Sequence, residues 1–209
     1  MNKIWVGFVT GFVKVTGVLP YLILVHPKVK WLEGSSKKIK GPAIVISNHT
    51  ALFDFVIMLF LFWRNIVHWQ IAEVLSNKRV LGPFLKSMGC ITVDRYKMDF
   101  SFLGESSDVL EDGGIVGIFP EARLPRPEEE RPLEFKPSAA FLALKADVPV
   151  IPVCTNGKYL KNLGQRCKVV VGAPFYVSEL SDSKLSEKEN LINISSKIRQ
   201  RIIDMGRDL

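Results

Sequence analysis

Residues 43–58, AIVISNHTALFDFVIM, decide the fold and hold the most informative polar side chains of the chain. The stretch opens with alternating apolar residues, becomes polar over residues 47–50, and continues as an apolar segment whose one acid is Asp54. This order predicts a strand, a turn and a buried helix. In open α/β proteins, functional side chains converge beyond the carboxyl ends of the strands. His49, in the predicted turn, is therefore the first candidate for a functional residue.

Strands alternate with helices along the rest of the chain. Apolar runs predict strands at residues 67–72, 90–93, 115–119, 148–154 and 168–171, and helical patterns predict helices at 52–63, 77–88, 100–111, 138–146 and from 187 onward. Residues 120–132 are rich in proline and charge, which forbids a regular element there. We therefore expect an α/β fold in which residues 28–209 form one domain, with a mainly parallel sheet flanked by helices.

Residues 4–25 are almost wholly apolar and contain a single charge, Lys14. A membrane-spanning helix needs about 20 such residues, but Lys14, three glycines and Pro20 argue against one straight span. We expect residues 1–27 to form a hydrophobic two-helix segment, hinged near residues 14–17, that associates with a membrane. The basic residues able to meet lipid phosphates are Lys3, Lys14, Lys28 and Lys30. A signal peptide and a hairpin buried against the core are the alternatives.

The composition limits the possible partners. The chain has 209 residues, of which 47% are hydrophobic, and its mean hydropathy of +0.17 is high for a soluble protein. Its 28 Lys and Arg against 21 Asp and Glu give a net charge of +7, which favours a nucleic acid, an anionic membrane or a phosphorylated substrate. No basic stripe interleaved with aromatic residues is present, so we do not expect nucleic acid binding.

The cysteines and histidines indicate neither a disulfide framework nor a metal site. Cys90, Cys154 and Cys167 are odd in number, widely spaced and mostly set in apolar runs, which is typical of reduced, buried cysteines in a cytoplasmic protein. The three histidines have no Cys or His at ligand spacing. We therefore predict that no metal is bound.

His49 and Asp54 lie five positions apart. Five residues of continuous helix end about 140° away from the starting face, so the pair could not share a helix face. The two side chains can meet if His49 lies in the turn and Asp54 in the first turn of the helix. A carboxylate on one imidazole nitrogen fixes the tautomer and leaves the other nitrogen as a base. This dyad has no nucleophile of its own, so a substrate would supply the hydroxyl; a purely structural histidine is the alternative.

The motif around this pair, NHTALFD at residues 48–54, resembles the N-H-x4-D signature of the glycerolipid acyltransferases, the family that includes 1-acylglycerol-3-phosphate acyltransferase. Three further blocks are similar in order and spacing. They are GCITVDR at 89–95, FPEAR at 119–123 with FKP at 135–137, and VPVIPV at 148–153. The blocks span residues 48–153, so the resemblance covers most of the predicted domain.

The resemblance implies transfer of a fatty acyl group from a thioester, acyl-CoA or acyl-ACP, to the free hydroxyl of 1-acylglycerol 3-phosphate, giving phosphatidic acid for phospholipid synthesis. It implies that His49 takes the hydroxyl proton and that Asp54 orients His49. The residues that would position the phosphorylated glycerol are Arg95, Glu121, Arg123 and Lys136. No permanently bound cofactor is implied, and the donor is a co-substrate. The enzyme would lie on the cytoplasmic face of a membrane as a peripheral or monotopic protein.

The chain departs from the family pattern at Ala51, where Ser is frequent, and at Ala122 and Ser138, where Gly is common. If Ala122 has a positive φ, its methyl group costs roughly 1 kcal/mol or more. We interpret the departures as a shift in substrate preference. The alternatives are another lysophospholipid as acceptor, or a non-catalytic lipid-binding module on the same scaffold. Residues 124–134 are expected to form a mobile, solvated loop. The alternative for Arg123, Arg126 and Arg131 is that they are solvated charges that answer the glutamates at 128–130.

Overall fold

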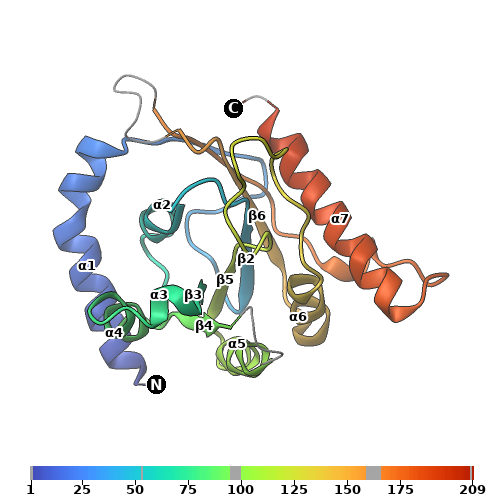
Figure 1. Cartoon of the computed structure of the whole chain (residues 1–209), viewed down its shortest axis with the longest axis horizontal. Helices are drawn as coiled ribbons and strands as arrows, with labels where there is room; N and C mark the ends of the chain where they lie inside the picture. The colour runs from blue at the N-terminus through green and yellow to red at the C-terminus, as the bar shows by residue number, and fades with distance from the viewer. Residues whose placement is uncertain (1, 53, 95–99, 159–165, 208) are drawn as a thin grey trace.

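A sheet of seven strands with helices on both faces makes up the fold (Figure 1). The computed structural model describes residues 2–52, 54–94, 100–158, 166–207 and 209. The strands are β1 (Lys28–Trp31), β2 (Ala43–Ser47), β3 (Val67–Ala72), β4 (Ile91–Val93), β5 (Ile115–Ile118), β6 (Val150–Thr155) and β7 (Lys168–Val171). The helices are α1 (Lys3–Leu24), α2 (Asp54–Leu61), α3 (Glu73–Ser76), α4 (Leu81–Ser87), α5 (Ser101–Glu111), α6 (Ser138–Ala146) and α7 (Glu187–Gly206), with a 3-10 helix η1 (Val177–Leu180).

β2 is the central strand of the sheet, whose order is β1-β7-β6-β2-β5-β3-β4. It pairs in parallel with β5 on one side and β6 on the other, so that Ile46 lies opposite both Ile118 and Pro152. The β6–β7 pair is antiparallel, and the other strand pairs are parallel. All five residues of β2 are buried, because helices cover both faces of the sheet. The predicted mainly parallel α/β fold is confirmed.

Two hydrophobic clusters fill the space on the two faces of the sheet. Ala43 and Val45 of β2 point into a cluster with α1, α2 and α4, while Ile44 and Ile46 point into a cluster with α5, α6 and α7. Figure 1 shows α1, α2 and α4 on one side of the strands and α6 and α7 on the other. The turn after β2 therefore opens at the carboxyl edge of the strands, between the two helical layers.

The N-terminal segment is a single helix, so the predicted two-helix hinge is wrong. α1 continues without a break through residues 14–17 and past Pro20. Gly17 is a contact point, because a Cβ there would lie 3.0 Å from the ring of Phe60. Tyr21 stacks on the same ring, with the centroids 4.3 Å apart. The absence of a side chain at Gly17 thus allows α1 to pack closely on α2.

Lys14 is buried against the end of α2, so the expected contact between this residue and lipid phosphate is also wrong. Its ammonium donates to the backbone carbonyl oxygens of Phe62 (3.1 Å), Trp63 (2.9 Å) and Asn65 (2.7 Å). These carbonyls follow the last residue of α2, where helix carbonyls lack partners within the helix. A lysine near a helix C-terminus satisfies such groups and interacts favourably with the helix dipole.

The remaining surface of α1 is apolar and exposed. Among the described residues, α1 is the one helix that is long and apolar enough to cross a membrane, and 22% of its apolar window is buried in the fold. The large exposed side chains are Ile4, Trp5, Phe8, Phe12, Val15, Leu19, Leu22, Ile23 and Leu24. α1 therefore packs lengthwise on the domain along one narrow face and leaves an apolar face uncovered.

Three other predictions differ from the structure. The helix predicted at residues 52–63 is shorter, Asp54–Leu61, because residues 50–52 form the turn. The helix predicted at 77–88 is shorter, Leu81–Ser87 (α4), and a short helix that was not predicted, α3, precedes it. The two pack so closely that a Cβ at Gly82 would collide with the carbonyl of Ser76. β1 was not predicted, because four half-exposed residues, KVKW, carry little signal.

We predict that Lys14→Met lowers the free energy of unfolding by about 1–3 kcal/mol, because three carbonyl oxygens lose their shared donor. Lys3→Met is the matched control. It removes an exposed charge from the same helix, and the pair of Lys3 with Asp112 lies on the surface, so the change should be under about 0.5 kcal/mol. Urea unfolding in detergent measures both. An equal loss of unfolding free energy in the two variants would contradict a stabilising role for the hydrogen bonds of Lys14.

Candidate active site

His49 and Asp54 are in direct contact at the carboxyl end of β2. The Nδ1 atom of His49 lies 2.9 Å from Oδ2 of Asp54. Asp54 is the first residue of α2 and is completely buried, whereas the His49 side chain is 19% exposed. The placement of His49 in the turn and Asp54 at the helix start is the one predicted from their spacing.

The Asp54 carboxylate also holds the turn itself. Its Oδ2 atom accepts hydrogen bonds from the backbone N–H of Thr50 (2.6 Å) and of Ala51 (2.9 Å), and its Oδ1 atom accepts one from the Thr50 hydroxyl (3.0 Å). A carboxylate in the first turn also interacts favourably with the helix dipole. Ala51 contributes only its backbone N–H to this network, so a residue without a hydroxyl group can hold this position of the turn.

The ring of His49 is fixed on one side by a stack of aromatic residues. Phe119 stacks on the imidazole with centroids 4.4 Å apart, and Trp69 stacks on Phe119 at 4.9 Å. Gly117 of β5 makes room for this stack, since a Cβ there would lie 2.4 Å from the Trp69 indole. With Nδ1 on Asp54 and one face covered, Nε2 is the nitrogen left to act on a ligand. Sequence reasoning missed Trp69, because nothing local ties it to His49.

Glu121 anchors the backbone of His49. Its Oε1 atom accepts a hydrogen bond from the N–H of His49 (2.6 Å), and its Oε2 atom accepts one from the N–H of Leu133 (2.8 Å). The side chain is 2% exposed. Burial raises the pKa of the Glu121 carboxyl above its usual range, and the two backbone hydrogen bonds act in the opposite direction. Both carboxylate oxygens of Glu121 thus already bind backbone N–H groups of the protein. The predicted contact of Glu121 with phosphorylated glycerol stays a prediction.

The segment that reaches Leu133 is also held by the last helix. Arg199 of α7 donates from Nε to the carbonyl oxygens of Pro132 (2.9 Å) and Leu133 (3.0 Å), and from Nη2 to Pro132 (2.6 Å). A chain of contacts therefore runs from α7 through residues 132–133 and Glu121 to His49. Sequence analysis did not single out Arg199, because the closing helix showed only an amphipathic pattern.

The other predicted phosphate contacts are Arg123, Lys136 and Arg95. The first two are exposed on the surface, and the third lies outside the described residues. Arg123 forms a two-pronged ion pair with Glu129, at 2.7 and 2.6 Å, on the surface loop. This pair corresponds to the alternative interpretation of Arg123 as a charge that answers a nearby glutamate, and it lowers the pKa of Glu129 to about 2. The Lys136 side chain is exposed, while its N–H donates to the carbonyl of Pro120 (2.9 Å). Arg95 lies outside the residues that the structure describes.

Asn48 joins β2 to the neighbouring strand beside the catalytic turn. Its side-chain amide donates to the carbonyl of Thr155 and accepts from the N–H of the same residue, both at 2.8 Å. Gly157 follows with φ of +65°, and a Cβ there would collide with the Thr50 side chain. Asn48 thus fixes where the turn begins, a structural role that the sequence did not reveal.

Ala122 has a φ of +60°, which meets the condition stated for its departure from the family pattern. A methyl group in this region costs roughly 1 kcal/mol or more compared with glycine. The residue lies directly after Glu121, and its N–H donates to the carbonyl of Phe119 (3.1 Å). The backbone turn at Ala122, between Glu121 and Arg123, is therefore strained.

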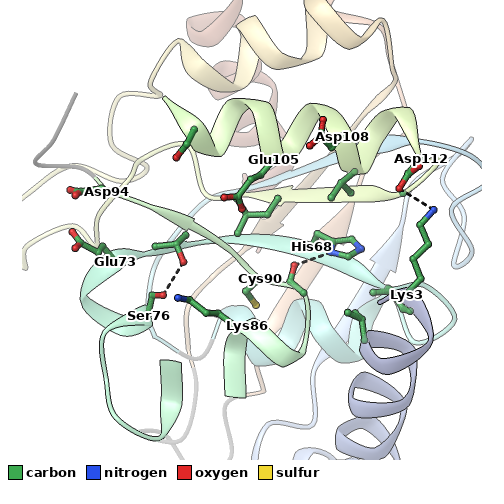
Figure 2. A pocket seen from close by; sticks show the side chains of 18 of the residues that line it. Lys3, His68, Glu73, Ser76, Lys86, Cys90, Asp94, Glu105, Asp108 and Asp112 are labelled. Atoms are coloured by element: carbon green, nitrogen blue, oxygen red, sulfur yellow. Dashed lines mark hydrogen bonds and ion pairs between the residues drawn. The ribbon is translucent and has the colours of Figure 1, made fainter. Parts of the chain in front are cut away.

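A separate cavity of about 870 Å³ lies at the outer edge of β4 (Figure 2). Residues of α1, α4 and α5 line it, and it includes neither His49 nor Asp54. His68 lies in its wall, with Nδ1 2.8 Å from the carbonyl of Gly89. Among the described residues, no three His, Cys, Asp or Glu side chains gather closely enough to hold a metal ion. The three cysteines are buried, as predicted.

The sequence matches the family described as Acyltransferase over residues 26–156, more than half of the chain and the part that carries His49, Asp54 and Glu121. The chain belongs to the acyltransferase family. The computed fold is similar to the crystal structure of the 1-acyl-sn-glycerophosphate (LPA) acyltransferase PlsC from Thermotoga maritima, with a TM-score of 0.68, 20% identity, and coverage of 99% of this chain and 84% of that one.

Sequence relatives within the acyltransferase family carry the same kind of name. The chain is 29% identical to a 1-acyl-sn-glycerol-3-phosphate acyltransferase of Bacillus subtilis over 68% of this chain and 70% of the relative. It is 28% identical to a putative 1-acyl-sn-glycerol-3-phosphate acyltransferase of Caenorhabditis elegans over 68% of this chain and 52% of the relative. The resemblance found in the motifs is confirmed at the level of the family.

We predict that Asp54→Asn lowers the turnover number about 10²–10⁴-fold, because the amide cannot accept from His49 and both backbone N–H groups together. Asp204→Asn is the control, since Asp204 lies in an exposed pair with Arg207 on α7. Thiol release from acyl-CoA in the presence of a lysophospholipid measures activity, and circular dichroism checks the fold. A folded Asp54→Asn enzyme with the wild-type rate would rule out the dyad.

We predict that Glu121→Gln lowers the turnover number roughly 10–100-fold and changes the KM for the acceptor little, because one N–H of His49 or Leu133 loses its acceptor. Glu134→Gln, an exposed change on the same loop, is the control and should behave as wild type. The turnover number and the KM for the acceptor separate a role in positioning His49 from a role in binding the acceptor. A raised acceptor KM at constant turnover would make Glu121 a substrate contact, as the family resemblance implies.

Proposed function

We propose that the protein transfers a fatty acyl group from a thioester, acyl-CoA or acyl-ACP, to the hydroxyl of 1-acylglycerol 3-phosphate and so makes phosphatidic acid. The observation that carries the proposal is the dyad of His49 and the buried Asp54, together with relatives named for this reaction. No described serine, threonine or cysteine side chain hydrogen-bonds to His49. A base without a protein nucleophile suits a reaction in which the substrate brings the hydroxyl.

The dyad supports direct transfer. Nε2 of His49 accepts the proton of the acceptor hydroxyl as its oxygen attacks the thioester carbonyl, and the Asp54 carboxylate stabilises the imidazolium that results. The tetrahedral intermediate then collapses, the C–S bond breaks, and the imidazolium returns the proton to the leaving thiolate. The acyl group passes in one displacement, so no acyl-enzyme is formed.

Three backbone amides beside the start of α2 are already engaged and are not free to bind an oxyanion. The N–H of His49 binds Glu121, and the N–H groups of Thr50 and Ala51 bind Asp54. These groups hold the base in place. A donor for the oxyanion must therefore come from elsewhere in the site.

Electrostatics support anionic substrates of the kind proposed. The net charge of +7 favours both a phosphorylated acceptor and either donor, since coenzyme A carries phosphates. Arg123, Lys136 and Arg95 remain the proposed phosphate contacts. The ion pair of Arg123 with Glu129 is exposed, so it can open at little cost to let the guanidinium bind phosphate. Another lysophospholipid is the second candidate acceptor, and Ala122 is the observation that favours it.

The proposed location is the cytoplasmic face of a membrane, where thioester donors are found and thiols stay reduced. The exposed apolar face of α1 would enter the lipid while its buried face stays on the domain. Because α1 contributes buried side chains to the core, it lies along the domain and does not stand free as a span. We propose a monotopic protein on this basis.

We predict that His49→Ala lowers formation of phosphatidic acid from acyl-CoA and 1-acylglycerol 3-phosphate at least 10³-fold, since it removes the base. His26→Asn is the control, because His26 is exposed at φ of +41°, a region that asparagine tolerates. Mass spectrometry of the product and thiol release measure the rates. Retention of the wild-type rate by His49→Ala would refute the mechanism. Wild-type activity on a different lysophospholipid alone would refute the acceptor and keep the mechanism.

A further inference from the structure

A second exposed apolar surface lies at the start of α4. Val80 is 81% exposed, Leu81 40% and Phe84 41%, and these three residues are named here the α4 patch. The next turn of the same helix is buried, since Leu85 and Met88 belong to the core. α4 is therefore firmly seated on the domain and presents its apolar residues outward.

The α4 patch lies next to the membrane-facing helix. α1 contacts α4 along its first half, where Val6 of α1 approaches Gly89 at the end of α4. Figure 1 shows α4 beside the N-terminal half of α1, on the same side of the sheet. The exposed residues Trp5 and Phe8 lie in that half of α1. The patch thus lies on the first turn of a helix that packs against α1, on the same side of the sheet.

Basic side chains flank the α4 patch. Lys78 and Arg79 precede it, and both are exposed. Within the described part of the chain, neither of the two forms an ion pair. Lys86 of the same helix lines the cavity beside β4 instead (Figure 2). Apolar residues bordered by lysine and arginine are typical of segments that enter the boundary between anionic head groups and acyl chains.

We propose that the α4 patch is a second point of contact with the lipid bilayer, beside α1, and that its basic flank binds anionic head groups. The proposal rests on the membrane association proposed above. A single helix lying in the membrane leaves the domain free to roll about the helix axis. A contact to one side of that axis removes this freedom and fixes which side of the domain faces the lipid.

A second copy of this chain is the competing occupant of the α4 patch. Three side chains offer far less than the roughly 800 Å² per partner of a standard protein interface. Unpaired basic residues around the patch would also face each other across a symmetric dimer. Charge and area both favour a lipid surface.

A polarity-sensitive fluorophore on a single introduced cysteine tests the proposal. The native cysteines are 7%, 6% and 0% exposed, so labelling is selective for the new thiol. The label is placed by Val80→Cys at the patch, by Phe8→Cys on α1, and by Ile192→Cys, an exposed apolar position on α7 across the sheet. The full chain is mixed with phosphatidylcholine vesicles that contain phosphatidylglycerol.

We expect the emission of the labels at positions 80 and 8 to shift to the blue on vesicles and that of the label at 192 to stay unchanged. In a separate pair of unlabelled variants, Lys78→Gln with Arg79→Gln should weaken vesicle binding roughly tenfold or more, at about 1 kcal/mol per charge. Lys184→Gln with Lys188→Gln, both exposed near the start of α7, should leave it unchanged.

Three results would overturn the proposal. A shift at position 8 without one at position 80 would show that α1 alone enters the lipid. A shift at position 80 that needs no vesicles and grows with protein concentration would show that a second copy covers the patch. No shift at either position would remove the membrane premise itself. Acyl transfer to a detergent-dispersed acceptor, measured in parallel, then reports separately whether the proposed reaction holds.

Discussion

The site depends on one buried carboxylate. Asp54 accepts hydrogen bonds from the His49 ring, from two backbone N–H groups of the turn and from the Thr50 hydroxyl, and none of its surface reaches solvent. The same group thus builds the turn and orients the His49 ring within it. An exchange of Asp54 therefore affects both the orientation of His49 and the hydrogen bonds of the turn. Burial of so polar a group is tolerated because its partners replace the water that it loses.

Glu121 performs the matching task one strand away. It binds the N–H of His49 with one oxygen and the N–H of Leu133 with the other, and Arg199 holds the carbonyls of the same loop. The two carboxylates therefore fix His49 from its ring and from its backbone. The strained φ of Ala122 lies between Glu121 and the exposed loop. Strain at such a position persists only because the surrounding contacts over-determine the turn.

Local sequence patterns predicted the fold class and the contact of His49 with Asp54. They failed for features that depend on contacts between residues far apart in the sequence. The alternation of strands and helices led to the mainly parallel sheet, and the spacing of His49 and Asp54 led to the turn at the helix start. The hinge in α1 was wrong because Lys14 finds its partners 48 to 51 residues away, directly after α2. The contact of Glu121 with His49 spans 72 residues. Such contacts arise from packing, and no periodicity along the chain reveals them.

Lys14 and Asp54 bind at opposite ends of the same helix. α2 has eight residues, so about 12 Å of rigid helix separates the catalytic turn from the carbonyls that Lys14 caps. If α1 lies in the membrane and His49 acts as the base, as proposed, a helix of fixed length joins the two. The height of His49 above the bilayer would then be set by the fold, and an acceptor anchored in that bilayer would present its hydroxyl within a narrow range of depths.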